Sequence, residues 1–209
     1  MSRIYNTSQE AYTLEHRHCY TVCMPDPIAN VPTMSRDKLK AAISAPQSDP
    51  ELFRAIVNAP FAQPAEAAFL FLGIVVLLFV DKKTGMIDRV ALSNTELAKN
   101  TTDVSLVPFS EIKIPANYSE NIISQTIATG KPHDTTDWKF LFDPAMTAEQ
   151  ARLNQASGGI AYSAVYPLKV RDGGAMIFSY FQYMHNIGAA QHDFMQTYSR
   201  LVEARLKAN

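Results

Sequence analysis

Apolar residues along the chain fall into runs and periodic groups that predict both strands and helices. The most apolar run, Ala67–Val80, contains no charged residue. It is shorter than the about 20 residues that a membrane-spanning helix needs. Its second half, Ile74–Val80, is rich in β-branched residues and predicts a buried strand. The turn Asp81–Gly85 and the segment Met86–Ser93 then complete a predicted antiparallel hairpin.

Three helices are expected before this hairpin. Ser35 has the chemistry of an N-cap for a short helix that Pro46 ends, and Asp49–Pro50 marks a stronger helix start. Pro64 opens a third helix that is expected to end near Leu72. The apolar residues of the second helix recur at helical spacing and should face the core: Leu52, Phe53, Ile56 and Val57.

The middle of the chain predicts one further strand and one helix. Asn94–Asp103 is polar and is assigned no element, whereas Val104–Val107 is strand-like. Pro115–Thr129 predicts a helix with isoleucines on one side. Gly130 follows it at the position of a left-handed C-cap.

The C-terminal part predicts a helix, a second hairpin and a final helix. Thr147 and Gln150 have capping-box spacing. Two extended segments, Ile160–Val170 and Ala175–Tyr183, flank a turn that contains two glycines, and Ala190–Lys207 is amphipathic. Strands joined by tight turns form an antiparallel sheet, and the helices must cover it. The predicted fold class is therefore a layered α+β domain.

Composition narrows the possible partners and compartment. Hydrophobic residues make up 47% and charged residues 19% of the chain, which is typical of a globular protein. The formal net charge of −1 gives no basic excess for binding nucleic acid. The N-terminus lacks the apolar core of a signal peptide, and two cysteines exclude a disulfide scaffold. A cytoplasmic location without membrane attachment is expected.

Residues 1–34 are predicted to form a partly irregular N-terminal arm, and residues 35–209 the domain proper. The arm is polar, rich in proline and without sustained periodicity. It holds four residues of types that bind zinc: His16, His18, Cys19 and Cys23. Zinc sites generally use two ligand pairs separated by a longer loop, so these closely spaced residues predict no metal site. The role of the arm stays open.

The order and spacing of several segments resemble the GAF domain family. Ser119–Pro132 is similar to the family's central helix and its Thr-Gly-Lys-Pro exit, and Asp137 falls where such domains often carry an acidic residue. Ser163–Leu168, followed by the turn at Gly173–Gly174, resembles the closing hairpin. The resemblance covers roughly residues 50–207 and implies an antiparallel sheet of about five or six strands, covered by helices in a layered α/β/α arrangement. The PAS fold is the main structural alternative.

The resemblance also implies a cavity between the sheet and the helices and loops over one face. The candidate ligand-binding residues are Phe109, Ile114, Tyr118, Asp137, Trp138, Phe140, Phe142, Tyr162, Tyr166 and Tyr180. Side chains alternate along a strand, so Tyr162, Ala164 and Tyr166 share one face and leave a dent with aromatic walls. Alternatively, these aromatic residues only pack the core, and the loop that carries Asp137 is simply solvated.

No catalytic residue is assigned. Some GAF-like proteins reduce free methionine sulfoxide or attach a bilin through cysteines in the domain, but no cysteine follows Cys23. The chain has no Walker loop, dinucleotide glycine pattern or metalloprotease helix. A small enzyme that uses His133 and Asp137 remains the weakest of three functional hypotheses.

The leading hypothesis is a sensory domain that binds an unidentified small molecule without covalent attachment and requires no cofactor. Ligand binding would order the loop at residues 133–146 and bias the packing of helices 50–58 and 190–207 in a homodimer. The signal would pass to a separate partner protein. The alternative is a structural or interaction domain whose cavity is filled by its own aromatic side chains.

Overall fold

The computed structural model describes residues 33–46, 48–170, 172–181 and 188–208. All of them belong to the compact unit Pro32–Asn209. The predicted arm, with its histidines and cysteines, lies outside the described residues apart from its last two positions.

Strands and helices follow one another along the unit in an α+β order. The strands are β1 (Leu72–Asp81), β2 (Met86–Leu92), β3 (Ile114–Pro115), β4 (His133–Thr135), β5 (Tyr162–Leu168) and β6 (Gly174–Tyr180). The helices before and between the first strands are α1 (Arg36–Ser44), α2 (Asp49–Asn58), α3 (Pro64–Phe69) and α4 (Glu96–Asp103). The later helices are α5 (Ile122–Thr129), α6 (Lys139–Phe142), α7 (Ala148–Ser157) and α8 (Ala189–Lys207). Two short 3-10 helices span Ala59–Ala62 and Phe109–Glu111.

The six strands form one antiparallel sheet with the order β3-β2-β1-β6-β5-β4. Each predicted hairpin forms as expected, and the two hairpins join where β1 pairs with β6. This junction places the most apolar strand at the centre of the sheet, where both of its faces are covered. The predicted α+β fold of about five or six strands in a layered arrangement is therefore confirmed.

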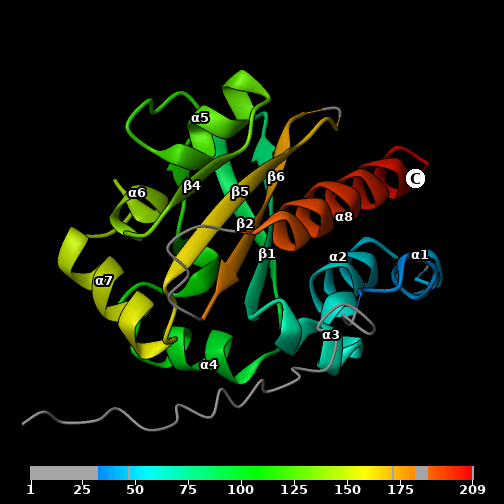
Figure 1. Ribbon diagram of the computed structural model, residues 1–209. Coiled ribbons are helices and arrows are strands. Elements are labelled where there is room, and N and C mark those ends of the chain that lie inside the picture. The colour runs from blue at the N-terminus through cyan, green and yellow to red at the C-terminus, as the bar shows by residue number, and fades with distance from the viewer. Residues whose placement is uncertain (1–32, 47, 171, 182–187, 209) are drawn as a thin grey trace, which may run out of the picture. The chain divides into compact units, whose positions relative to one another are not determined.

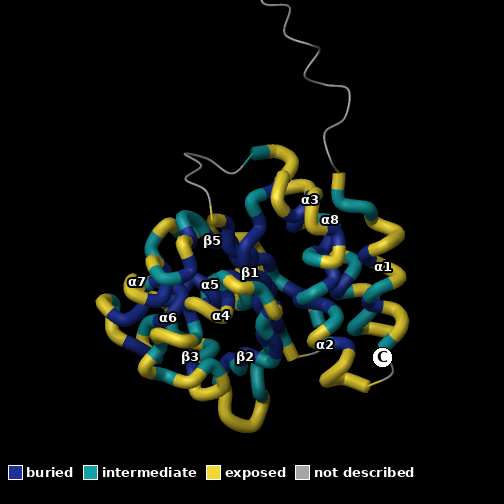
Figure 2. The backbone as a smooth tube through the Cα atoms, turned by 90° about the horizontal axis from the view of Figure 1, so that it is seen from below, coloured by how far each residue is buried: buried dark blue, intermediate teal, exposed yellow. Residues whose placement is uncertain are grey.

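Helices cover both faces of the sheet and enclose two separate apolar cores. Helices α1, α2 and α8 pack on one face, and α4 to α7 lie over the other (Figure 1). Alternation along β1 divides its side chains between them, with Val75 and Leu77 in the first core and Val76 and Leu78 in the second. Buried residues follow the strands through the middle of the domain, and exposed residues lie on the outer turns (Figure 2).

Several local predictions, two helix caps and the buried side of α2, are confirmed. Gly130 ends α5 with a left-handed φ of 64°, and its N–H donates to Thr126. Thr147 caps α7 by accepting from the backbone N–H of Gln150. The apolar residues of α2 face the first core, because Leu52, Ile56 and Val57 are buried and Phe53 packs at its margin.

Other local predictions are wrong. The polar segment 94–103 contains helix α4, which begins after the N-cap Thr95 and buries only Ala98 and Thr101. Val104–Val107 is not a strand, because Ser105 donates to the Val107 carbonyl and folds this segment into a bend. Helix α4 is short and mostly polar, and only Leu97 joins Ala98 and Thr101 at the core, so its composition obscured its helical spacing.

Two predicted helix boundaries are also wrong. Helix α5 begins at Ile122, after the cap Asn121, and not at Pro115, which pairs with Met86 in β3. Helix α3 ends at Phe69 and not near Leu72, which already belongs to β1. Phe71 makes the connection with a left-handed φ of 58°, an uncommon conformation for an aromatic residue.

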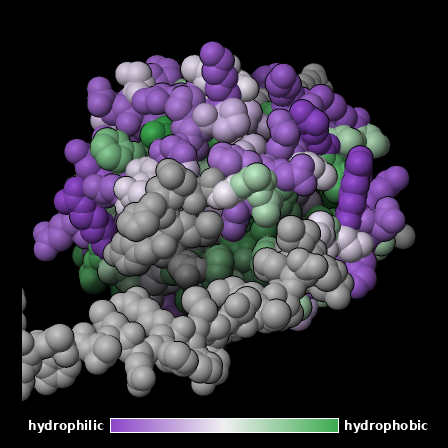
Figure 3. Space-filling model, in the orientation of Figure 1, coloured by the Kyte–Doolittle hydropathy of each residue, from purple (hydrophilic) through white to green (hydrophobic). Residues whose placement is uncertain are grey.

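The apolar side of the final helix, α8, packs against the core of the same chain. Phe194, Met195, Tyr198 and Val202 of α8 are buried against the sheet. Hydrophilic side chains cover much of the face seen in Figure 3. Among the described residues, no helix combines the length and apolar character needed to cross a membrane.

Candidate functional site

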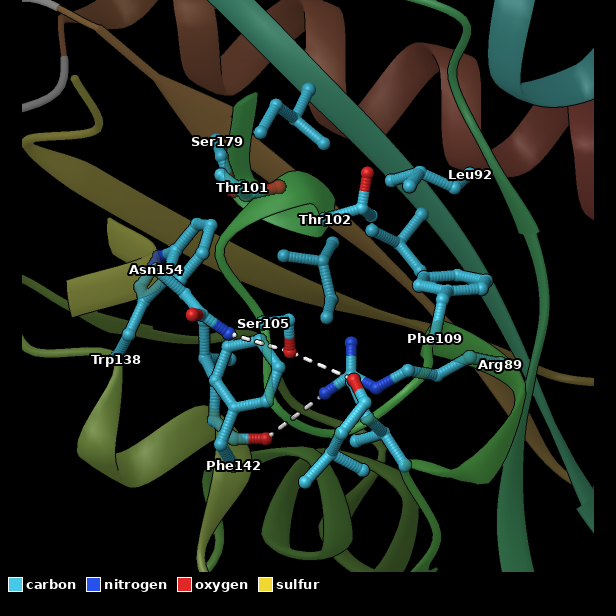
Figure 4. A pocket seen from close by; sticks show the side chains of 16 residues that line it. Arg89, Leu92, Thr101, Thr102, Ser105, Phe109, Trp138, Phe142, Asn154 and Ser179 are labelled. Atoms are coloured by element: carbon cyan, nitrogen blue, oxygen red, sulfur yellow. Dashed lines mark hydrogen bonds between the residues drawn. The ribbon is translucent and has the colours of Figure 1, made fainter. Parts of the chain in front are cut away.

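A cavity of about 40 Å³ lies between the sheet and the layer formed by α4, α6, α7 and the segment 104–112. A water molecule needs about 10–15 Å³ of such space, so the cavity has room for a group of roughly three to four heavy atoms. Its polar lining residues are Arg89, Thr101, Thr102, Ser105, Asn154 and Ser179. Aromatic and aliphatic side chains make up the remaining wall (Figure 4).

A β-bulge in β2 aims Arg89 into this cavity. Leu77 of β1 pairs with Ala91 and Leu78 pairs with Arg89, so Val90 has no partner on β1. Residues three apart in a regular strand face opposite sides of a sheet, but the extra residue reverses this relation. Arg89 and Leu92 therefore both line the cavity, while Val90 and Ala91 pack into the other core.

The Arg89 guanidinium is a buried positive charge. The residue is 8% exposed, and its Nη2 donates to the Leu141 carbonyl at 3.2 Å. The guanidinium carbon lies 4.5 Å from the centre of the Phe142 ring, within the range of a cation–π contact. Burial lowers the pKa of Arg89 to about 9, so the side chain keeps its charge at neutral pH.

Helix α7 holds one wall of the cavity through buried amides. The Gln150 side chain donates to the Val104 carbonyl at 3.2 Å and to Asn154 Oδ1 at 2.7 Å. Asn154 in turn donates to Ser105 Oγ at 3.1 Å. These bonds fix the bend at residues 104–107 against the helix, and Figure 4 shows Asn154 and Ser105 side by side at the cavity.

The same helix holds the opposite wall through Gln155. Its Oε1 accepts from the backbone N–H of Trp138 at 2.9 Å, and its Nε2 donates to the carbonyls of Thr136 and Ile160. The Trp138 indole then donates to Ser163 Oγ at 2.8 Å. Since α7 ties down both lining segments, a shift of this helix would change both walls together.

Close packing of α7 against α4 depends on Gly158. A Cβ at this position would lie 2.4 Å from Thr101 Cγ2, far inside van der Waals contact. Thr101 lines the cavity, so the absence of a side chain at Gly158 sets the position of this part of the wall.

The structure brings together only part of the predicted ligand-binding set. Phe109, Trp138 and Phe142 line the cavity, and Ile114 packs in the same apolar core without lining it. Trp138 and Phe142 also contact each other, with ring centres 5.3 Å apart.

The predicted tyrosines lie on the other face of the sheet. Tyr162 and Tyr166 share one face, as the alternation predicted, and Tyr180 lies on the same face, but this face belongs to the core under α1, α2 and α8. Tyr162 donates to Asp134, and the Tyr166 hydroxyl lies 3.0 Å from His192 Nδ1. The sheet separates these tyrosines from Phe109, Trp138 and Phe142, so the ten residues do not surround one hollow.

The remaining predicted residues are engaged outside the cavity. Asp137 accepts from Arg152 Nη2 at 2.6 Å and from the backbone N–H of Lys139 at 2.9 Å. The hydrogen bonds from Arg152 hold the pKa of Asp137 below its ordinary value. Tyr118 donates to Asp143 at 2.7 Å, and Phe140 is 41% exposed.

His133 and Asp137 do not form a hydrogen-bonded pair. His133 Nδ1 lies 3.0 Å from Thr126 Oγ1, whereas Asp137 is bonded to Arg152. Within the described part of the chain, no cluster of histidine, cysteine and carboxylate side chains has the arrangement of a metal site.

Sequence reasoning missed Arg89, Asn154 and the two glutamines of α7. The sequence carries no distinct signal for Arg89, because a charge that alternates with apolar residues on a strand is typical of a solvent-facing position. Its burial follows from the elements that cover this face of β2. The amides of α7 gave no signal either, because their burial depends on loops that are distant in sequence.

The fold is similar to GAF domains of known structure. The GAF domain of an Acinetobacter phosphoenolpyruvate-protein phosphotransferase has a TM-score of 0.55 and 9% identity, covering 82% of this chain and 90% of that one. Residues 122 to 287 of a methyl-accepting chemotaxis protein give 0.54 at 12% identity, covering 82% and 95%. The A. aeolicus nlh2 GAF domain in an inactive state gives 0.51 at 11% identity, covering 82% and 93%.

These likenesses define the class of fold. No protein-family model matches the chain, and no curated protein matches it. At such low identities the likeness concerns the fold alone, and it agrees with the sheet order and the two helical layers described above. The fold is GAF-like.

Proposed function

We propose that this domain is a sensory module that binds a small molecule in the cavity beside Arg89. The observation that carries the proposal is a buried cation in a mostly apolar cavity with a few inward-facing polar groups. Such a mixture is typical of small-molecule sites, where apolar walls supply affinity and polar groups fix orientation. Similar folds in a chemotaxis protein and a phosphotransferase support a sensory role.

Helix α7 is the element through which ligand binding would act. A ligand that contacts the 104–112 and 136–142 segments would shift them. Such a shift alters the hydrogen bonds that these segments make with Gln150, Asn154 and Gln155. A ligand shifts a conformational equilibrium only when it binds the two states with different affinity. Here the two states would differ in how closely the two walls approach each other. A ligand that contacts both walls would bind the closed state more tightly, and α7 would move with the walls because it is bonded to both. Transmission to a homodimer interface and a separate partner protein is part of the proposal.

A cavity-filling variant tests the location of binding. Val107 lines the cavity, whereas its neighbour Leu106 is 84% exposed. Val107→Phe should abolish the thermal shifts that a metabolite library produces with the wild type, and the matched control Leu106→Phe should preserve them. Backbone amide signals of Ser105 and Trp138 should move with the same compounds. Binding that survives in Val107→Phe, or compounds that move only signals of the opposite face, would refute this location.

The small size of the cavity favours one alternative, a structural domain that holds no ligand. About 40 Å³ is far below the several hundred cubic ångströms of sites for drug-sized molecules. Native mass spectrometry of the gently purified protein separates the two functions. A bound small molecule that disappears on denaturation and refolding supports sensing, and equal masses before and after, together with no hit in the thermal-shift screen, support the structural role.

A further inference from the structure

Among the described residues, no acidic side chain pairs with the charge of the cavity wall. Arg89 is the only charged side chain among the lining residues that the structure describes. The ion pairs of the described residues all involve groups other than Arg89. The neighbouring Asp88 is paired with Lys113, whose Nζ lies 3.2 Å from Asp88 Oδ1. Buried charges in proteins are ordinarily paired, because removing an isolated ion from water is costly. A buried cation of this kind that borders a cavity therefore indicates a position where an anion can bind.

The hydrogen-bonding groups of Arg89 are also incompletely used. A guanidinium has five N–H donors, and here one of them, on Nη2, bonds the Leu141 carbonyl. The Nε–H is buried and has no partner in the described structure. Figure 4 shows the guanidinium pointing into the cavity toward Ser105 and Phe142. Free donors on a planar fork match the two oxygens of a carboxylate.

We propose that Arg89 is the anion-binding residue of the cavity and that the ligand is a small monocarboxylic acid. This inference rests on the proposed ligand-binding function and specifies its chemistry. The carboxylate lies against the guanidinium, whereas the Asn154 amide and the Ser105 hydroxyl are already used as donors to Ser105 Oγ and the Val107 carbonyl. The short organic body of the acid lies among the apolar side chains of Val107, Phe109 and Ile112.

Charge and volume favour a carboxylate over a phosphate group. A phosphate monoester carries close to two negative charges at neutral pH, and the cavity supplies one cation. The cavity of about 40 Å³ also has room for only about three to four heavy atoms. Acetate has the required charge and size, and propionate and pyruvate exceed that size by about one or two heavy atoms, whereas nucleotides and aromatic acids are far too large for the cavity in this conformation.

The binding test compares each acid with its neutral amide. Propionate and propionamide have nearly the same shape and differ in charge, so titrating each into the ¹⁵N-labelled full chain isolates the contribution of the anion. We expect propionate, acetate or pyruvate to bind about tenfold or more tightly than the matching amide, because hydrogen bonds to charged groups are the strong ones. The Nε–H resonance of Arg89 should shift on binding the acid, and inorganic phosphate should bind more weakly than the acids.

Two variants separate charge from geometry. Arg89→Met removes the cation at similar volume and should lose the preference for acid over amide. Arg89→Lys retains the charge without the planar fork and should bind with intermediate affinity. Arg205→Met serves as the control, because Arg205 donates to the Ile43 and Pro46 carbonyls in the other core and should leave binding unchanged. The wild-type Nε–H shift needs no variant, so the test stands if Arg89→Met does not fold.

The outcomes distinguish this inference from the broader function. Acids and amides that bind equally, or a preference that persists in Arg89→Met, would overturn the anion role while leaving a ligand-binding cavity. Phosphate binding that is tighter than that of every acid and moves the Arg89 signal would overturn the carboxylate class. A library without any ligand that Val107→Phe blocks would overturn both.

Discussion

The two faces of the sheet are built on opposite principles. The face under α1, α2 and α8 is closed by a chain of aromatic contacts that runs from Tyr166 through Phe178 and Phe194 to Tyr198, with ring centres 5.7–6.0 Å apart. On this face the buried Tyr198 hydroxyl donates a hydrogen bond to the Ile56 carbonyl at 2.6 Å. The face under α4 to α7 instead holds a cavity, a buried cation and a network of side-chain amides.

This difference separates stability from ligand binding within one sheet. A close-packed apolar face loses contacts with every atom removed, whereas a face that borders a cavity already lacks some contacts. Binding sites commonly carry local features that reduce stability. The same central strand serves both faces, so the packed side can support the less closely packed arrangement on the other. Four sets of substitutions test how far this division holds.

Phe178→Ala should have the largest effect, because Phe178 is fully buried in the aromatic chain. We expect a loss of about 3–5 kcal/mol in the free energy of unfolding, measured by urea denaturation. The matched substitution Phe142→Ala, next to the cavity, should cost about 2–3 kcal/mol, because its ring already borders empty space. A larger loss for Phe142→Ala would contradict the division.

Gly158→Ala should cost about 1–3 kcal/mol, since the added Cβ meets Thr101 and forces α4 and α7 apart. Its effect should include weaker ligand binding, because Thr101 is part of the cavity wall. The control Gly85→Ala places a Cβ where nothing lies within 4 Å, at a φ of 69°, and should cost about 1 kcal/mol through backbone conformation alone. Unaltered binding in Gly158→Ala would show that the wall tolerates this shift.

Arg89→Met should raise the free energy of unfolding by about 1–2 kcal/mol, because removing the buried charge outweighs the lost bond to Leu141 and the contact with Phe142. Arg205→Met, in the packed half of the domain, should instead lower it by about 1–2 kcal/mol through the loss of charged hydrogen bonds. Opposite signs for the two arginines are the expected result of chemical denaturation, and destabilisation by both would remove the argument that Arg89 is unbalanced.

Asp137→Asn should have the smallest effect. The folded protein lowers the pKa of Asp137 below its ordinary value of 3.8, so its ion pair with Arg152 stabilises the folded state above that pH. The contribution is lost as the pH falls through the folded pKa. Because Arg152 is largely exposed, we expect about 0.5–1 kcal/mol at pH 7 and a difference that vanishes in strong acid. A difference that grows in acid would have the wrong sign.

Strands and caps were predictable because their causes are local. The run Ile74–Val80 and the turn that follows it determine a hairpin whatever the rest of the chain does, and Gly130 and Thr147 act within one helical turn. Helix α4 was missed because its exposed face is polar and only two of its residues are buried. Tertiary contacts with the amides of α7 turned the strand-like segment 104–107 into a bend.

The site was less predictable because it depends on which face of the sheet each side chain occupies. Aromatic residues on β5 and those near α6 are close in sequence and chemically alike, yet the sheet lies between them. The key residue of the cavity is a single arginine on an otherwise ordinary alternating strand. Nothing local distinguishes it from a solvent-facing charge until the partners of β2 on both sides are known.

The unpaired Val90 also determines how relatives of this domain would look in sequence. A strand without the extra residue would carry the cation and the next cavity-lining residue two or four positions apart, while here Arg89 and Leu92 are three apart. Homologues that conserve the cavity should therefore keep an arginine followed at that odd interval by an apolar residue. Those that lose one residue at this point should lose the arginine as well, since the shortened strand would expel one of the two from the cavity.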